Sequence, residues 1–225
     1  MTDTVTVVLP TLNEAGNVGL LIGELKTALG SAMAEAIVVD GQSTDTTQAE
    51  AATAGARVIV DATGYAAALQ RGMREAKTTW VLVLDADRSH RADDALKLWT
   101  ARQDADLVIG SRLVKGGGSD GTAFRRFLSR LLASLFRAFA RLPARDISSG
   151  FRLYRREMFV DAPLAARFFE VQPALLAHAV GRKGRIKEVG IHYHQRGAGR
   201  SKNRIFKYGM AFLRTLWRMR RQRSA

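Results

Sequence analysis

Short apolar runs alternate with helix-like segments through the first half of the chain, and this alternation limits the folds open to it. The expected strands are residues 5–9, 36–39, 57–60, 80–84 and 106–109. The expected helices are residues 14–29, 44–53, 66–76 and 91–102, with Asn13 and Ser43 or Thr44 as N-caps. Strands separated by helices form a mostly parallel sheet that helices cover on both faces. The sequence therefore predicts an α/β fold.

The size and composition of the chain fit one such domain. It has 225 residues, of which 47% are hydrophobic, so it can bury a sizeable core. It has no cysteine, which excludes a disulfide framework and a cysteine metal site. The formal net charge of +14 favours polyanionic partners, namely nucleic acid, anionic lipid or a phosphorylated substrate.

Much of the positive charge lies after Ala123, where arginines recur between apolar residues. Residues 124–142 and 205–219 both have apolar side chains at helical spacing, so we expect two basic amphipathic helices. These helices would either lie on an anionic bilayer surface or pack on the sheet. We expect a catalytic domain over residues 1–203, followed by a basic amphipathic helix or tail at 204–225 that belongs to the same domain or associates with a membrane.

The sequence shows neither an uninterrupted apolar stretch of about 18 residues nor a secretory signal at its start. Any membrane contact is therefore expected to be peripheral. The expected location is the cytoplasm, at the cytoplasmic face of the membrane.

Polar residues follow three of the expected strands at the points where those strands end. They are Pro10 to Glu14 after the first strand, Asp40 after the second, and Asp85-Ala86-Asp87 after the fourth. In open α/β sheets, ligands bind at the carboxyl ends of the strands. We therefore expect these side chains to line one crevice.

Asp85 and Asp87 are the candidate metal ligands. Two carboxylates one residue apart at a strand end can face the same hard cation, and Mg²⁺ or Mn²⁺ is the expected ion. Such an ion would neutralise a diphosphate leaving group. Acidic residues at strand ends also cap the following helix, so the pair alone leaves both interpretations open. Asp40 could hydrogen-bond a nucleoside or simply form a turn, and Glu14 could contact a nucleotide or favour a helix N-terminus.

Two arginines, one after a strand end and one on an expected helix, are candidates for binding phosphate. Arg112 follows a strand end, and Arg125 and Ser129 are four residues apart on one helical face. Arginine makes bidentate phosphate contacts and serine adds a donor, but a solvated basic face is the alternative. His192 and His194 alternate along an expected strand, where we expect them to have a structural role.

Five motifs in order give the chain a resemblance to a known family. They are Leu9-Pro10-Thr11-Leu12-Asn13-Glu14, Val39-Asp40-Gly41-Gln42-Ser43-Thr44-Asp45, Asp85-Ala86-Asp87-Arg88-Ser89-His90, Gly110-Ser111-Arg112, and Ser148-Ser149-Gly150-Phe151-Arg152-Leu153-Tyr154-Arg155-Arg156. Over about the first 205 residues the chain resembles family 2 glycosyltransferases with a GT-A fold. The motif around Gly150 resembles the branch of dolichyl-phosphate mannose synthases and bacterial polyprenyl-phosphate glycosyltransferases.

The resemblance implies a role for each matching position. Nucleotide-sugar binding is implied for Pro10, Leu12, Glu14, Asp40, Asp85, Ala86, Asp87, Arg196 and Lys202. Acceptor-phosphate binding is implied for Arg112, Arg125 and Ser129, and Asp87, Arg112 and Arg125 are the implied catalytic residues. The implied metal ligands are Asp85 and Asp87.

The chain also departs from the family pattern in several places. Asp40-Gly41 stands where paired aspartates are common, and Arg88 replaces a usual leucine. Gly64-Tyr65-Ala66 replaces a more glycine-rich turn, and Ala174 lacks an expected carboxylate. These departures bear on the donor and the acceptor more than on the fold.

The expected reaction is inverting transfer of a hexose from a nucleotide diphosphate sugar, either GDP-mannose or UDP-glucose, to a polyprenyl phosphate. The nearest alternative is a family 2 enzyme that uses a sugar or small-molecule hydroxyl, with Asp146 or Glu170 as the base. A nucleotidyltransferase lacks its usual N-terminal loop at residues 10–16. A basic nucleic-acid-binding protein is the alternative from another class, although we find no recognised nucleic-acid motif.

Overall fold

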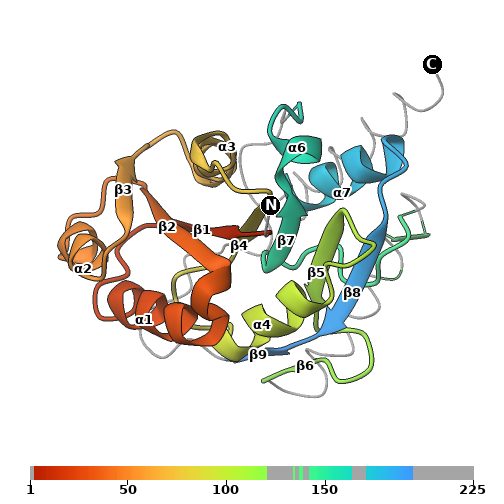
Figure 1. Cartoon of the computed structure of the whole chain (residues 1–225), viewed down its shortest axis with the longest axis horizontal. Helices are drawn as coiled ribbons and strands as arrows, with labels where there is room; N and C mark the ends of the chain where they lie inside the picture. The colour runs from red at the N-terminus through yellow and green to blue at the C-terminus, as the bar shows by residue number, and fades with distance from the viewer. Residues whose placement is uncertain (1–2, 121–133, 135–136, 139–141, 164–170, 195–225) are drawn as a thin grey trace.

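The computed structural model describes residues 3–120, 134, 137–138, 142–163 and 171–194 (Figure 1). A seven-stranded sheet runs through the centre of this part of the chain, in the order β3-β2-β1-β4-β7-β5-β8. Its strands are β1 (Val5–Thr11), β2 (Met33–Asp40), β3 (Arg57–Val60), β4 (Trp80–Val83), β5 (Leu107–Ser111), β7 (Arg152–Arg155) and β8 (Ile186–Gly190). A separate parallel pair consists of β6 (Gly118–Ser119) and β9 (His192–Tyr193).

The predicted mostly parallel sheet is confirmed. β7 is the exception, since it pairs antiparallel with both β4 and β5. The five predicted strands are all present, and β3 has the predicted bounds. The sequence pattern gave no prediction of β7, which the chain supplies from a late segment to lie between two earlier strands.

Helices cover both faces of the sheet, as Figure 1 shows. α1 (Val18–Leu29), α2 (Thr47–Thr53) and α4 (Ala92–Thr100) contribute to one buried cluster with Val5, Val7 and Leu9 of β1. α3 (Tyr65–Glu75), α6 (Arg156–Phe159) and α7 (Val171–Gly181) contribute to a second cluster with Val8. A 3-10 turn, η1 (Gly30–Ala32), connects α1 to β2. The alternation along β1 thus divides its side chains between two apolar cores.

α3 and β1 approach each other closely at Gly72. A Cβ added to this glycine would lie 2.3 Å from Cγ1 of Val8, well inside van der Waals contact. Only glycine therefore allows the helix to lie at this depth on the sheet.

The first helix begins later than predicted, and a contact between loops explains why. Asn13 is not an N-cap: it has a φ of 54°, and α1 starts at Val18. The backbone N–H of Asn13 donates to Ser43 Oγ, and that of Glu14 donates to Thr47 Oγ1, at 2.8 Å each. The loop after β1 therefore bonds to the loop after β2, and α2 begins at Thr47, beyond the predicted caps.

The two predicted basic amphipathic helices lie almost wholly outside the described residues. Residues 204–225 are outside them entirely, and only residues 134, 137–138 and 142 of the segment 124–142 are inside. Among the helices that the structure describes, none is long and apolar enough to cross a membrane.

Candidate active site

The carboxyl ends of β1, β2 and β4 lie at one edge of the sheet, as the sequence predicted. β1 pairs in parallel with both other strands, with Thr11 opposite Asp40 and Val8 opposite Val83. The polar residues that follow these strands are therefore brought to the same edge.

On the β1–β2 side, Leu12 and Asp40 differ sharply in exposure. The Asp40 side chain is fully buried and accepts hydrogen bonds from the Ser43 N–H at 2.8 Å and from Gln48 Nε2 at 2.7 Å. It thus stabilises the turn that leads to α2. Leu12 is 44% exposed and packs beside Gly41, which leaves an apolar side chain open at the sheet edge.

Pro10 and Glu14 border the same loop. Pro10 is half-buried in β1 opposite Val39. The Glu14 carboxylate accepts a hydrogen bond from Asn17 Nδ2 at 3.2 Å, and the Glu14 carbonyl accepts the N–H of Val18 at the start of α1. Glu14 therefore contacts Asn17 and Val18 at the start of α1.

The segment that follows β4 carries Asp85, Ala86 and Asp87 at this edge of the sheet. Asp87 is 1% exposed and accepts the N–H of Ser89 through Oδ1 at 3.0 Å, while Asp85 is half-buried and Ala86 is buried. A Cβ at Gly150 would lie 3.7 and 3.8 Å from the two carboxylate oxygens of Asp85. Glycine thus keeps space open beside this carboxylate. The two carboxylates form a hard oxygen donor set of the kind that Mg²⁺ and Mn²⁺ prefer, so the residues fit such an ion.

A buried chain of hydrogen bonds ends beside Asp85. The Tyr154 hydroxyl donates to Gln172 Oε1 at 3.0 Å, and Gln172 Nε2 donates to the Tyr65 hydroxyl at 3.3 Å. Burial, and then the negative charge of Asp85, raise the pKa of Tyr65 well above its ordinary value. Tyr65 therefore stays protonated at neutral pH and borders the same space at Gly150.

Arg112 and Asp146 form a bidentate ion pair at this edge. Arg112 donates through Nε to Oδ2 at 2.7 Å and through Nη2 to Oδ1 at 2.8 Å, and its backbone N–H also donates to Oδ2. Burial raises the pKa of Asp146, but the hydrogen bonds and charge of Arg112 outweigh it and leave that pKa below its ordinary value. Asp146 is therefore a weak base. The negative charge of Asp85 is among the causes that raise the pKa of Arg112.

Arg152 fixes the backbone that carries Gly150. Its side chain is fully buried and donates to three carbonyl oxygens, those of Ser149 at 2.8 Å, Ile147 at 2.8 Å and Gln172 at 2.7 Å. A buried guanidinium with its donors used in this way holds the loop of residues 147–149 to α7.

His90 packs beneath the same edge. Its ring lies 4.9 Å from that of Phe151 and 5.2 Å from that of Tyr193, measured between centroids. Burial lowers the pKa of His90 to about 4, so the ring is neutral at physiological pH. Neutral His90 is a packing group here.

Several predicted site residues lie outside the described part of the chain. These are Arg125, Ser129, Arg196, Lys202 and the alternative base Glu170. Of the departures from the family pattern, Arg88 bonds Glu24 of α1, with a φ of 57° in the left-handed region. Ala174 lies in α7, two residues after Gln172.

Comparison with known proteins assigns the chain to a family. The sequence model described as "Glycosyl transferase family 2" matches residues 6–161. The chain belongs to this family. It is a glycosyltransferase with the GT-A fold, as the resemblance implied.

Two curated relatives and one solved structure illustrate the likeness. An uncharacterized glycosyltransferase of Mycobacterium tuberculosis is 36% identical over 203 residues, which is 89% of each chain. The undecaprenyl-phosphate mannosyltransferase of Micrococcus luteus is 32% identical over 88% of this chain and 86% of its own. Glucosyl-3-phosphoglycerate synthase of M. tuberculosis, solved with Mn²⁺, UDP and glucosyl-3-phosphoglycerate, has a TM-score of 0.75 and 24% identity over 96% of this chain and 80% of its own.

Sequence patterns alone did not single out every residue at this edge. Tyr65 was noted only as a departure from a glycine-rich turn, and Gln172 lies two residues before Ala174, where a carboxylate was expected. Both are neutral side chains whose importance comes from a hydrogen bond between α3 and α7. His90 gave no signal because its environment comes from Phe151 and Tyr193, which are distant in the sequence.

Proposed function

We propose that this glycosyltransferase transfers a hexose, mannose or glucose, from a nucleotide diphosphate sugar to a polyprenyl phosphate with inversion at the anomeric carbon. The observation that carries the proposal is that β4 and β5 both pair antiparallel with β7, so that Asp85 and Asp87 after β4 and Arg112 after β5 follow strands that end at the same edge of the sheet. Such an edge offers carboxylates for a cation and a guanidinium for an anion.

Asp85 and Asp87 would hold Mg²⁺ or Mn²⁺ on the donor diphosphate. When bound, the ion would neutralise charge on the leaving nucleotide diphosphate. Gly150 keeps the space beside Asp85 clear, and the protonated Tyr65 hydroxyl borders it as a neutral donor. Exposed Leu12 would offer apolar contact to the nucleoside, with Pro10, Glu14, Asp40 and Ala86 shaping the loop around it.

Arg112 would bind the phosphate of the acceptor, together with Arg125 and Ser129 by position in the family motif. Nε and Nη2 of Arg112 bond Asp146 and Ser148, and Nη1 bonds no other described residue. Asp146 therefore fixes the orientation of the guanidinium while one nitrogen remains to meet a phosphate oxygen.

A phosphate acceptor also suits the weak basicity of Asp146. A phosphate monoester is already charged near neutral pH, because its second pKa is about 6. It needs no general base, and catalysis then comes from alignment and from stabilisation of charge. A hydroxyl acceptor would need a base, and a carboxylate held by Arg112 is poorly suited to that role.

The relatives support a lipid phosphate as the acceptor and leave the sugar open. The Micrococcus luteus relative is by name an undecaprenyl-phosphate mannosyltransferase, which supports mannose as the sugar and a lipid phosphate as the acceptor. The structural relative instead carries UDP, Mn²⁺ and a phosphorylated glucoside. A phosphorylated small molecule is therefore the second candidate acceptor. The family assignment makes the protein a transferase, so the +14 charge is no longer evidence for a nucleic-acid-binding protein.

Paired variants test the proposed assignment of residues. Asp87→Asn should lower kcat at least about 100-fold, the scale of losing a charge-stabilising group, and Arg125→Ala should raise the KM for polyprenyl phosphate. Asp93→Asn and Arg145→Ala change exposed side chains of the same types and serve as controls. Full activity in Asp87→Asn would overturn the proposed role of the carboxylate pair.

A further inference from the structure

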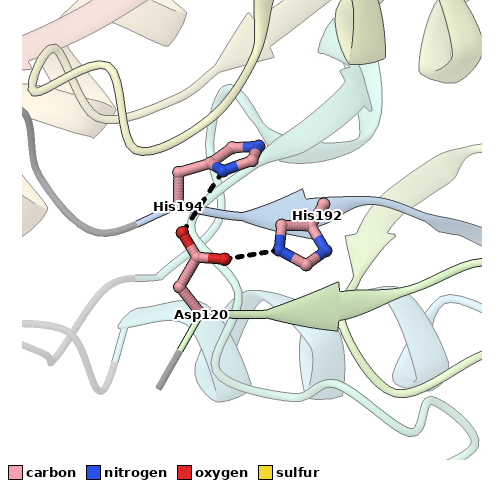
Figure 2. Close-up of side chains that lie close together, drawn as sticks. All are labelled: Asp120, His192 and His194. Carbon is pink, nitrogen blue, oxygen red and sulfur yellow. Dashed lines mark hydrogen bonds and ion pairs between the residues drawn. The ribbon is translucent and has the colours of Figure 1, made fainter.

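Asp120, His192 and His194 form a compact cluster outside the proposed donor site (Figure 2). The Asp120 carboxylate lies between the two imidazoles, with Oδ1 2.8 Å from Nε2 of His192 and Oδ2 3.3 Å from Nδ1 of His194. One candidate ligand atom from each residue lies within 4.8 Å of the other two. The three side chains are 38% to 46% exposed, so a dissolved ion can reach them.

The backbone around the cluster is fixed by hydrogen bonds. β6 and β9 pair in parallel with Gly118 opposite His192, and the N–H of Asp120 donates to the Tyr193 carbonyl at 2.9 Å. The N–H of His194 donates to the Ser89 carbonyl, also at 2.9 Å. The ligand positions are therefore set by the backbone before any ion binds.

Gly118 leaves room for the His192 ring beside β6. A Cβ at residue 118 would lie 2.9 Å from Nδ1 of His192, closer than real Cβ atoms come to their neighbours. The absence of a side chain at this position lets the ring lie over β6 and present Nε2 to Asp120.

We propose that Asp120, His192 and His194 bind a transition-metal ion of the Zn²⁺ class. Two imidazole nitrogens and one carboxylate oxygen suit Zn²⁺, Co²⁺ or Ni²⁺, whereas Mg²⁺ prefers oxygen ligands alone. Ligand bonds of about 2.1 Å in a tetrahedral site place neighbouring ligand atoms about 3.4 Å apart. In the cluster the carboxylate oxygens lie 2.8 and 3.3 Å from the imidazole nitrogens, and one ligand atom from each residue lies within 4.8 Å of the others. Three protein ligands leave a fourth position for water or an anion.

The ion would join β6 to β9 close to the proposed active site. The chain continues from Asp120 toward Arg125, and from His194 toward Arg196 and Lys202, all of which have proposed substrate contacts. His194 also touches the donor-metal loop through Ser89. Binding at the cluster would therefore fix the starting points of two segments that carry substrate-binding residues.

The test is Zn²⁺ titration by calorimetry on tag-free, metal-stripped protein, with the visible absorption of Co²⁺ as a second readout of its ligands. The Asp85→Ala/Asp87→Ala double variant provides the background, so that the proposed donor site cannot contribute. We expect one Zn²⁺ per chain in this background. Asp120→Asn and His192→Ala should each weaken the binding at least about tenfold, and exposed Asp104→Asn should not.

Circular dichroism will show whether each variant is folded, and the change in Asp120→Asn is nearly isosteric. Absence of a Zn²⁺ site in the double variant would mean that the cluster is an ion-paired triad only and would overturn the proposal. Equal affinity in His192→Ala and its parent would do the same. Neither result depends on sugar transfer, so the proposal can fail while the proposed function stands.

Discussion

Arg112 bonds Asp146 through two side-chain nitrogens, yet only the aspartate is enclosed. Asp146 is 1% exposed, whereas the Arg112 side chain keeps 30% of its surface in solvent. The pair therefore connects a buried anchor to an open edge, where the remaining nitrogen of the guanidinium can meet a ligand. Asp146 acts as a positioning residue for Arg112.

Asp146→Asn should lower the free energy of unfolding by about 2 to 3 kcal/mol, since removal of one partner leaves a partly buried charge unpaired. Because the pKa of Asp146 is lowered in the fold, the pair stabilises the protein above the ordinary carboxyl pKa of 3.8 and loses its effect as pH falls through the lower folded value. Urea denaturation at neutral pH measures the change, with exposed Asp161→Asn as the control. Equal losses in the two variants would contradict this role.

Replacement of Arg152 by leucine should be more severe, because three buried carbonyl oxygens lose their donor. Each unsatisfied group costs about 1 to 3 kcal/mol, so the protein should lose much of its stability or fail to fold. Arg152→Lys keeps the charge, so its stability should lie between that of the wild type and that of Arg152→Leu. Thermal denaturation compares both with Arg145→Leu, an exposed control. A melting temperature unchanged in Arg152→Leu would refute the importance of these bonds.

Gly72→Ala and Gly23→Ala should change stability in opposite directions, although both glycines lie inside helices. The new Cβ at residue 72 would overlap Val8 and should cost about 1 to 3 kcal/mol. At residue 23 nothing lies within 4 Å, so alanine should stabilise α1 by about 0.5 to 1 kcal/mol. Denaturant unfolding measures the stability of both variants. Stabilisation by both changes would show that α3 does not lie so close to β1.

His90 should make the protein less stable as pH falls from about 7.5 to about 5.0. Its pKa is about 4 in the fold and 6.5 when unperturbed, so the unfolded chain takes up a proton in this range while the folded chain does not. The linkage amounts to about 2 kcal/mol over the interval. The free energy of unfolding is measured for wild type and His90→Gln at both pH values, with chelator present. The difference between the two proteins isolates the contribution of His90 to the pH dependence. An identical pH dependence in the two proteins would rule it out.

The local apolar pattern was sufficient to predict five strands of the sheet, but contacts between distant segments decided the rest. The predicted run at 80–84 became the central strand β4 because uninterrupted apolar residues suit a sheet covered on both faces. The run at 57–60, which begins with Arg57, became the partly exposed edge strand β3. β7 was missed because Arg152 and Arg155 flank its two apolar residues. The charge of Arg152 is accommodated in the core by carbonyl oxygens, which a residue pattern does not reveal.

Only the site residues that follow a predicted strand could be predicted from the sequence. Asp85 and Asp87 followed an evident strand, so their place at the sheet edge could be expected. The chain from Tyr154 through Gln172 to Tyr65 joins three segments of the fold, and no spacing along the sequence announces it. The Asp120, His192 and His194 cluster could not be predicted for the same reason, since the pairing of β6 with β9 brings Asp120 beside the two histidines.

The most direct test of the central claim is to compare two acceptors that differ only in phosphate. Polyprenyl phosphate and the matching polyprenol are each incubated with the protein, Mn²⁺ and labelled GDP-mannose or UDP-glucose, and lipid-extracted product is identified by mass spectrometry. If the acceptor is a lipid phosphate, one of the two donors yields a polyprenyl-phosphate hexose and polyprenol yields no product. Equal transfer to polyprenol, or donor turnover unaffected by either lipid, would contradict the proposed acceptor.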